Sequence, residues 1–164
     1  MSAAVLGLVG TATVIGVANA APEKAGHHCA TNVDNGQEKC FKTLLLAQKY
    51  AQQQIKDNAP EAQTSVLKPT DVVIGTLFKR FSFGGDSMTL WGSHPCTSNG
   101  KANFYFNLPE SWKGQLSSVQ SWARCDIILH TAPYLQGAAS SPLRDLIPRL
   151  DNDWNNKAQS IEFR

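Results

Sequence analysis

The chain has 164 residues, of which 42% are hydrophobic and 17% are charged, so it has room for one ordinary domain or two very small ones and not for a large multidomain assembly. Fifteen lysine and arginine residues against thirteen acidic residues leave a formal charge of +2. That charge is too small for the basic surface that nonspecific nucleic-acid binding requires, so we expect no nucleic-acid partner.

The first twenty residues contain no charged side chain, and an apolar run from Ala3 to Val17 leads into Ala18-Asn19-Ala20. A short apolar run that ends in a small-residue pattern is typical of a secretory signal peptide. A membrane anchor is the alternative, but the run contains three glycines and is shorter than the roughly 20 residues that span a bilayer. We therefore predict a signal peptide over residues 1–20, a secreted extracellular protein, and no membrane span after the signal is removed.

The chain contains four cysteines, Cys29, Cys40, Cys96 and Cys125, which we expect to pair in an oxidising compartment. Four cysteines allow three pairings. Local pairing is our prediction, Cys29 with Cys40 and Cys96 with Cys125, because the first two flank a short turn-rich stretch and the last two lie in the C-terminal half. A zinc site near Cys29 is a weaker alternative because neither pair has a CxxC spacing.

Residues 37–57 carry apolar side chains near the spacing of an amphipathic helix, with Asp34 or Asn35 available as the N-cap. The Pro-, Gln- and Ser-containing stretch 61–69 then indicates a linker. From residue 72 onward, short runs of β-forming residues alternate with turn residues, which favours a sandwich of antiparallel strands. These runs are Val72–Ile74, Leu77-Phe78, Met88–Trp91, Phe104–Phe106, Val119, Ile127–Leu129 and Ile161–Phe163.

The C-terminal region contains an internal repeat. The segment from Trp112 to Ser118 matches the segment from Trp154 to Ser160, with both tryptophan and serine displaced by 42 residues. Upstream, Phe78 to Gly85 has a weaker counterpart in His130 to Gly137. The first copy holds a loop about ten residues longer, and Cys96 lies inside it.

These residues resemble the βγ-crystallin family. Phe78, Phe83 and Gly85 fit the aromatic, four residues, aromatic, any residue, glycine signature of its Greek-key hairpin. The glycine suits a backbone conformation that a side chain disfavours, and the aromatic rings pack over the hairpin. The structural residues of the two motifs would be Phe78, Phe83, Gly85, Trp112 and Ser118 in the first, and Gly137, Trp154 and Ser160 in the second.

The resemblance implies an all-β fold, a Greek-key sandwich of two four-stranded antiparallel sheets, preceded by an N-terminal helical extension. The expected organisation is a signal peptide (1–20), the extension and linker (21–70), and a βγ-crystallin-like domain (71–164). Within that domain, the first motif spans residues 71–122 and the second spans 125–164.

The family's calcium motif implies which residues would bind the ion. The first copy, residues 113–118, keeps the hydroxyl of Ser117 and has Gly114 where the family carries Asn or Asp. The second copy keeps Asn155 and Asn156 but has Gln159 in place of a hydroxyl ligand. One weak site built from Asn155, Asn156, Lys157 and Ser117 could therefore survive, and the site that pairs Gly114 with Gln159 should be lost.

We favour a simpler interpretation of these turns, in which the Asn and Ser side chains only form local hydrogen bonds that cap the strands. No cofactor is then required. Any calcium binding would be weak, near the millimolar affinities of extracellular modules.

Catalysis finds little support in the sequence. The only histidines are His27, His28, His94 and His130, and none lies in a nucleophile elbow, a metalloprotease motif or a phosphate-binding loop. His130 occupies a hairpin position where the family carries an aromatic residue, so packing explains it better than acid-base chemistry. We predict a non-catalytic protein.

The expected function is binding of an extracellular protein by a monomer, as a protease inhibitor or an antimicrobial, toxin-like factor. The contact surface would be the loop from His94 to Lys101, because rigidity reduces the entropy cost of binding. A loop without a partner is an equal alternative. Its candidate residues are His94, Pro95, Thr97, Ser98, Asn99 and Lys101.

Two further functions remain open from the sequence. One is a weak calcium-binding structural module. The other is a carbohydrate- or cell-wall-binding module that uses an exposed tryptophan, for which Trp91, Trp112, Trp122 and Trp154 are the candidates.

Overall fold

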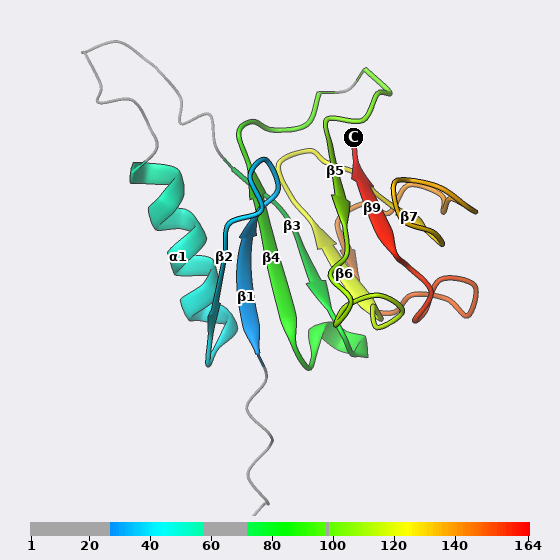
Figure 1. Cartoon of the computed structure of the whole chain (residues 1–164), viewed down its shortest axis with the longest axis horizontal. Helices are drawn as coiled ribbons and strands as arrows, with labels where there is room; N and C mark the ends of the chain where they lie inside the picture. Colours follow the sequence, from blue (N-terminus) through cyan, green and yellow to red (C-terminus); the bar gives the residue numbers. More distant parts are fainter. Residues whose placement is uncertain (1–26, 58–71, 98) are drawn as a thin grey trace, which may run out of the picture.

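The computed structural model describes residues 27–57, 72–97 and 99–164 (Figure 1). The predicted signal peptide and the predicted linker over 61–69 lie outside the described residues. Within the described part of the chain, no helix has both the length and the apolar character needed to cross a membrane.

The strands form two sheets (Figure 1). The larger has six strands in the order β2-β1-β4-β3-β6-β8, and the smaller has three in the order β5-β9-β7. The strands are β1 (His28–Asn32), β2 (Glu38–Phe41), β3 (Val72–Phe78), β4 (Ser87–Gly92), β5 (Phe104–Asn107), β6 (Ser118–Ser121), β7 (Ile127–His130), β8 (Leu146–Ile147) and β9 (Ser160–Phe163).

This arrangement corrects the prediction of two four-stranded sheets. The larger sheet gains two strands because the hairpin of β1 and β2 adds to its edge, with β1 running parallel to β4. The smaller sheet has three strands because its next segment makes only isolated bridges, Leu143 to Ile127 and Ala139 to His130. That segment follows the edge of β7 too irregularly to count as a strand.

The main core lies between the two sheets. Alternate residues of β4 from the large sheet meet alternate residues of β5, β7 and β9 from the small one, as period-two burial requires. Strand β3 contributes Ile74 and Leu77, which are three positions apart because a bulge interrupts the alternation. The largest fully buried side chains of this cluster include Leu77, Met88, Leu90, Ile127, Leu129 and Phe163. The Phe163 ring packs closely against the backbone of Gly75, where an added Cβ would lie 2.9 Å from the ring.

The predicted helix is shorter than expected. Helix α1 spans Leu44–Asp57, and residues 38–41 of the expected helix form β2 instead. Thr43 is the N-cap, with its hydroxyl accepting a hydrogen bond from the Leu46 amide at 3.3 Å. Asp34 and Asn35, the predicted caps, lie in the turn between β1 and β2, where Asn32 Oδ1 accepts from both of their amides.

A second apolar cluster anchors α1 at the β1 and β2 end of the large sheet (Figure 1). Ala47 and Ala51 of the helix are completely buried against Ala30 of β1 and Trp91 of β4. Small side chains allow the helix to lie close to the sheet, so the indole of Trp91 fills the space between them.

Each motif begins with a folded hairpin. In the first, Ser82, Phe83 and Gly85 have φ values of 55°, 61° and 73°, and the Phe78 and Phe83 rings pack at 5.5 Å between centroids. This hairpin contains the short 3-10 helix η1 (Phe81–Phe83).

The second hairpin repeats the same backbone. Tyr134, Leu135 and Gly137 have φ values of 57°, 57° and 76°. Gly137 cannot be replaced without rearrangement, because its Cβ would lie 2.5 Å from Thr131 Oγ1. The weak sequence match between the two hairpins therefore corresponds to one structural unit used twice.

Two buried serines hold these hairpins in place through hydrogen bonds to their backbone. Ser118 Oγ donates to the Arg80 carbonyl at 2.6 Å and accepts from the Phe83 amide at 3.1 Å. Ser160 Oγ donates to the Ala132 carbonyl at 2.7 Å and accepts from the Leu135 amide at 3.0 Å. Both serines are fully buried. Each hydroxyl is thus the hydrogen-bond partner of one amide and one carbonyl in a left-handed turn, whose backbone groups are not paired with a strand.

Replacing Ser118 or Ser160 by alanine should reduce the free energy of unfolding by about 1–3 kcal/mol, because a partly buried amide and a partly buried carbonyl lose their partner. Urea denaturation would measure the change. Ser111→Ala is the matched control: Ser111 is exposed, so its loss should stay within about 0.5 kcal/mol. Equal effects for Ser118→Ala and the control would contradict this account.

Candidate functional site

The two turns predicted to carry calcium ligands lie side by side and are held by crossed backbone bonds. The Gly114 amide donates to the Ala158 carbonyl at 2.9 Å, and the Asn156 amide donates to the Leu116 carbonyl at 2.8 Å. Gly114 and Asn156 have φ values of 64° and 59°. The two motifs therefore place equivalent left-handed residues in equivalent positions.

The structure brings two of the predicted ligands together. Ser117 Oγ lies 3.3 Å from Asn156 Oδ1, with the serine buried and the asparagine exposed. Asn155 Oδ1 is buried and has no hydrogen-bond partner among the described residues. Lys157 is exposed, and its amide donates to the Trp154 carbonyl at 3.2 Å.

These donors fit calcium only in part. Calcium takes six to eight oxygen ligands and favours carboxylates. The side-chain oxygens that meet here, from Ser117 and Asn156, are both neutral, and so is that of the adjacent residue Asn155. In the second predicted combination, the Gln159 amide donates to the His130 carbonyl at 2.8 Å, and Gly114 has no side chain to offer.

Both predicted disulfides are present. Cys29 bonds Cys40 across the β1 and β2 hairpin, and Cys96 bonds Cys125. Glu38 lies near the first bridge, but the two sulfurs beside it are bonded to each other and are not free thiolate ligands. The second bridge is buried and joins the long loop of the first motif to the turn between the two motifs.

The predicted partner loop is braced from beneath by one side chain. Asn103 Oδ1 accepts from the amide and the hydroxyl of Thr97, at 3.1 and 2.9 Å, and its Nδ2 donates to the Lys101 carbonyl at 3.1 Å. The Asn103 amide itself donates to the Phe163 carbonyl of β9 at 2.7 Å. The loop is thus tied to the small sheet through Asn103.

The remaining loop residues lie at the surface. The His94 ring stacks on Phe104 with 4.5 Å between ring centroids, and Pro95 follows it half-buried. Asn99 and Lys101 are exposed, with Asn99 Oδ1 accepting from the Lys101 amide at 2.9 Å. Ser98 lies outside the described residues.

The histidines sit in separate environments. His130 is buried, with Nε2 3.5 Å from Glu162 Oε2. His28 Nδ1 lies 2.8 Å from Ser87 Oγ, and burial lowers the pKa of His28 although the nearby Asp86 opposes this effect. His94 stacks instead on Phe104, the first residue of β5.

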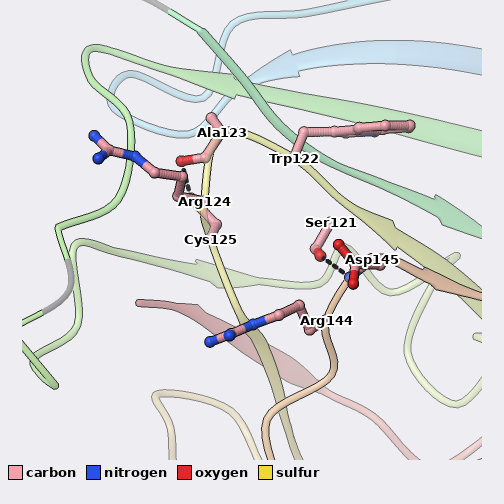
Figure 2. Close-up of a pocket in the computed structure, with 7 residues that line it drawn as sticks. All are labelled: Ser121, Trp122, Ala123, Arg124, Cys125, Arg144 and Asp145. Atoms are coloured by element: carbon pink, nitrogen blue, oxygen red, sulfur yellow. Dashed lines mark hydrogen bonds between the residues drawn. The ribbon is translucent and has the colours of Figure 1, made fainter.

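A surface pocket of about 480 Å³ lies where the chain passes from the first motif to the second (Figure 2). It was not predicted. Its lining consists of Ser121, Trp122, Ala123, Arg124, Cys125, Arg144 and Asp145. Sequence reasoning did single out Trp122 and Cys125, but nothing in the local sequence indicates that Arg144, twenty residues further along the chain, meets them.

Arg144 is fixed beside this pocket by Asp126. Its Nε and Nη2 donate to the two oxygens of Asp126 at 2.6 and 2.7 Å. This bidentate bond lowers the pKa of Asp126, burial opposes the effect, and the charges of Arg144 and Arg164 add to it. The carboxylate of Asp126 is largely buried, whereas the Arg144 side chain remains mostly exposed.

The Asp126 pKa predicts a loss of stability in acid. A carboxyl whose folded pKa is depressed stabilises the protein above its unfolded pKa of about 3.9, and this stabilisation disappears as the pH falls through the folded value. Urea unfolding between pH 5 and pH 2.5 should therefore show a steeper decline for the wild type than for Asp126→Asn. The control Asp153→Asn removes an exposed carboxylate and should keep the wild-type slope. Parallel curves for wild type and Asp126→Asn would contradict the assignment.

Comparison with solved structures finds βγ-crystallin domains. The domain from Flavobacterium johnsoniae is 20% identical with a TM-score of 0.42, and the match covers 56% of this chain and 93% of that one. The domain from Clostridium beijerinckii is 16% identical with a TM-score of 0.43, over 55% of this chain and 95% of that one. The N-terminal domain of protein S is 18% identical with a TM-score of 0.43, over 56% and 94%.

No protein-family model and no curated protein sequence matches the chain. The structural matches extend over about 56% of the chain. The described residues form a β-rich fold with one α-helix.

Proposed function

We propose that the protein is a secreted, non-catalytic binding protein that acts on an extracellular protein through the loop from His94 to Lys101, as a protease inhibitor or an antimicrobial factor. The observation that carries the proposal is the brace formed by Asn103, which bonds both Thr97 and Lys101. The loop is exposed, yet its backbone is held from within.

The hydrogen bonds from Asn103 favour binding because they order the loop before a partner arrives. A loop that is already ordered loses little conformational entropy when a partner covers it. The disulfide at Cys96 and the bond from the Cys96 amide to the Ala123 carbonyl, at 3.1 Å, fix one end of the loop. The bond from Asn103 to Phe163 fixes the other end.

Lys101 suggests the first class of target to test. It is the exposed basic side chain within the braced segment, and its backbone carbonyl is held by Asn103. A protease that accepts lysine next to the cleaved bond would meet a substrate-like segment that resists displacement. The two disulfides support secretion, because such bonds persist in oxidising compartments.

Inhibition constants against a panel of secreted serine proteases, including lysine-specific ones, would test the proposal. Lys101→Glu should abolish inhibition, because it reverses the charge offered to the specificity pocket. Asn103→Ala should weaken it by roughly tenfold or more, because the loop then becomes ordered only on binding. Cleavage of the Asn103 variant at the loop should accompany the weaker inhibition.

Lys49→Ala is the matched control, since Lys49 is an exposed lysine of α1, away from the loop. It should inhibit like the wild type. The antimicrobial form of the proposal is tested with the same variants in a growth assay on competing microorganisms. Wild-type protein inactive in both assays, or activity that Lys101→Glu leaves unchanged, would refute the loop as the functional surface.

A weak calcium-binding module is the second candidate. The observation that favours it is the 3.3 Å approach of Ser117 Oγ to Asn156 Oδ1. The residue that precedes Asn156 in the chain, Asn155, has a buried Oδ1 with no hydrogen-bond partner among the described residues. These are the residues that would hold the ion. Bound calcium would add a positive charge that draws the two turns together, whereas the neutral ligands keep its affinity low.

Calcium titration calorimetry and thermal melts in calcium and in chelator would test this site. If calcium binds, the dissociation constant should be about 10⁻⁴ to 10⁻³ M, with a higher Tm in calcium. Asn156→Gly and Ser117→Ala should abolish both effects. Glycine is the better replacement at residue 156 because φ there is 59°.

Asn152→Ala, a change at an exposed neighbouring position, serves as the control. A flat titration, with identical melts in calcium and chelator, would leave these turns with a structural role only.

A further inference from the structure

Several residues with a strained backbone line the pocket between the motifs. Eight non-glycine residues of the described chain have positive φ. Five of them belong to features repeated in both motifs: Ser82 and Phe83 match Tyr134 and Leu135, and Asn156 matches Gly114. The other three are Ala123, Arg124 and Asp145, with φ values of 51°, 62° and 63°, and all three line the pocket.

The surroundings hold these residues in their unfavourable conformation. The Cys125 amide donates to the Trp122 carbonyl at 2.9 Å, which closes a tight turn over Ala123 and Arg124. The Asp145 amide donates to Ser121 Oγ at 2.7 Å, and the Ser121 amide donates to the Asp145 carbonyl at 2.9 Å. The left-handed conformation is unfavourable for a residue with a side chain, and such strain is found most often at binding and catalytic sites.

One guanidinium of the lining, that of Arg124, has no acidic partner among the described residues, and its side chain is exposed. Arg144 uses two donors on Asp126, which orients its guanidinium and leaves its other donors free. Asp126 neutralises Arg144 and Asp145 offsets Arg124, so the pocket has no net positive charge. A single carboxylate in contact with Arg124 therefore suits it better than a doubly charged phosphate.

Trp122 supplies a flat apolar surface at the same pocket. Its side chain is 40% exposed, whereas Trp91 and Trp112 are buried and Trp154 is half-buried. The ring is oriented by a bond from its Nε1 to Thr76 Oγ1 at 3.4 Å. Figure 2 shows the indole extending to one side and the guanidinium groups of Arg124 and Arg144 extending to the other.

We propose that this pocket binds an acidic polysaccharide composed of uronic acid units. One sugar ring stacks on Trp122, the carboxylate of a neighbouring unit pairs with Arg124 and Arg144, and the Asp145 carboxylate accepts from sugar hydroxyl groups. Among the ligands with an apolar face, several hydroxyls and one carboxylate per unit, a uronic acid chain matches all of these groups. The open pocket suits a segment of a chain.

Isothermal titration with oligogalacturonates and retention in gels containing polygalacturonate would test the proposal. Fully methyl-esterified polygalacturonate keeps the hydroxyls and loses the charge, so its retention should be at least tenfold weaker. Arg124→Gln should weaken binding to the acidic form at least tenfold and leave the weak retention by the esterified form unchanged. Trp122→Ala should reduce retention by both forms. Near-ultraviolet circular dichroism would verify that the variants are folded.

Arg149→Gln is the matched control, since Arg149 lies elsewhere, over the Phe81 ring. It should bind like the wild type. The proposal fails if polygalacturonate is not retained, if Arg149→Gln loses as much binding as Arg124→Gln, or if polyglutamate binds as tightly with the same dependence on Arg124. The last outcome would assign the pocket to acidic protein segments. None of these outcomes depends on the 94–101 loop, so the loop and the pocket are tested separately.

Discussion

The β-sandwich depends on two buried hydroxyl groups. Ser118 and Ser160 each sit at the start of a strand and hold a folded hairpin through one donated and one accepted bond. Without them, the left-handed turns would leave buried backbone groups unpaired. The crossed bonds of Gly114 and Asn156 then join the two motifs. Because these contacts close the framework, the connecting segments can vary without disturbing it.

The Cys96–Cys125 bridge connects the two surfaces for which functions are proposed. Cys96 belongs to the long loop and Cys125 to the lining of the pocket. The long loop of the first motif is therefore attached to the junction between the motifs. Its extra length could be predicted from the spacing between the glycine and the tryptophan of that motif. A mutation that shifts the backbone of one surface should also shift the other, because the disulfide joins them. A mutation that changes only an exposed side chain should affect one surface alone.

Repetition made much of the sandwich predictable. The 42-residue displacement of tryptophan and serine corresponds to repeated hydrogen bonds, such as those from Trp112 to Pro109 and from Trp154 to Asp151. The β1 and β2 hairpin was missed because its short strands gain stability from β4, which lies 59 positions away at the paired residues His28 and Ser87. The pocket was missed because Ala123 and Arg124 give no sequence signal for left-handed backbone, which usually calls for Gly or Asn.

The added hairpin also decides what the large sheet presents to other molecules. Without β1, the six-residue strand β4, every residue of which is now buried, would form the edge and be open to pairing. With it, the edge is β2, four residues long, which carries the charged side chains of Glu38 and Lys39. Short, charged edge strands resist further strand addition. The hairpin of β1 and β2 thus limits further growth of the sheet, and its cross-strand disulfide keeps the two strands paired.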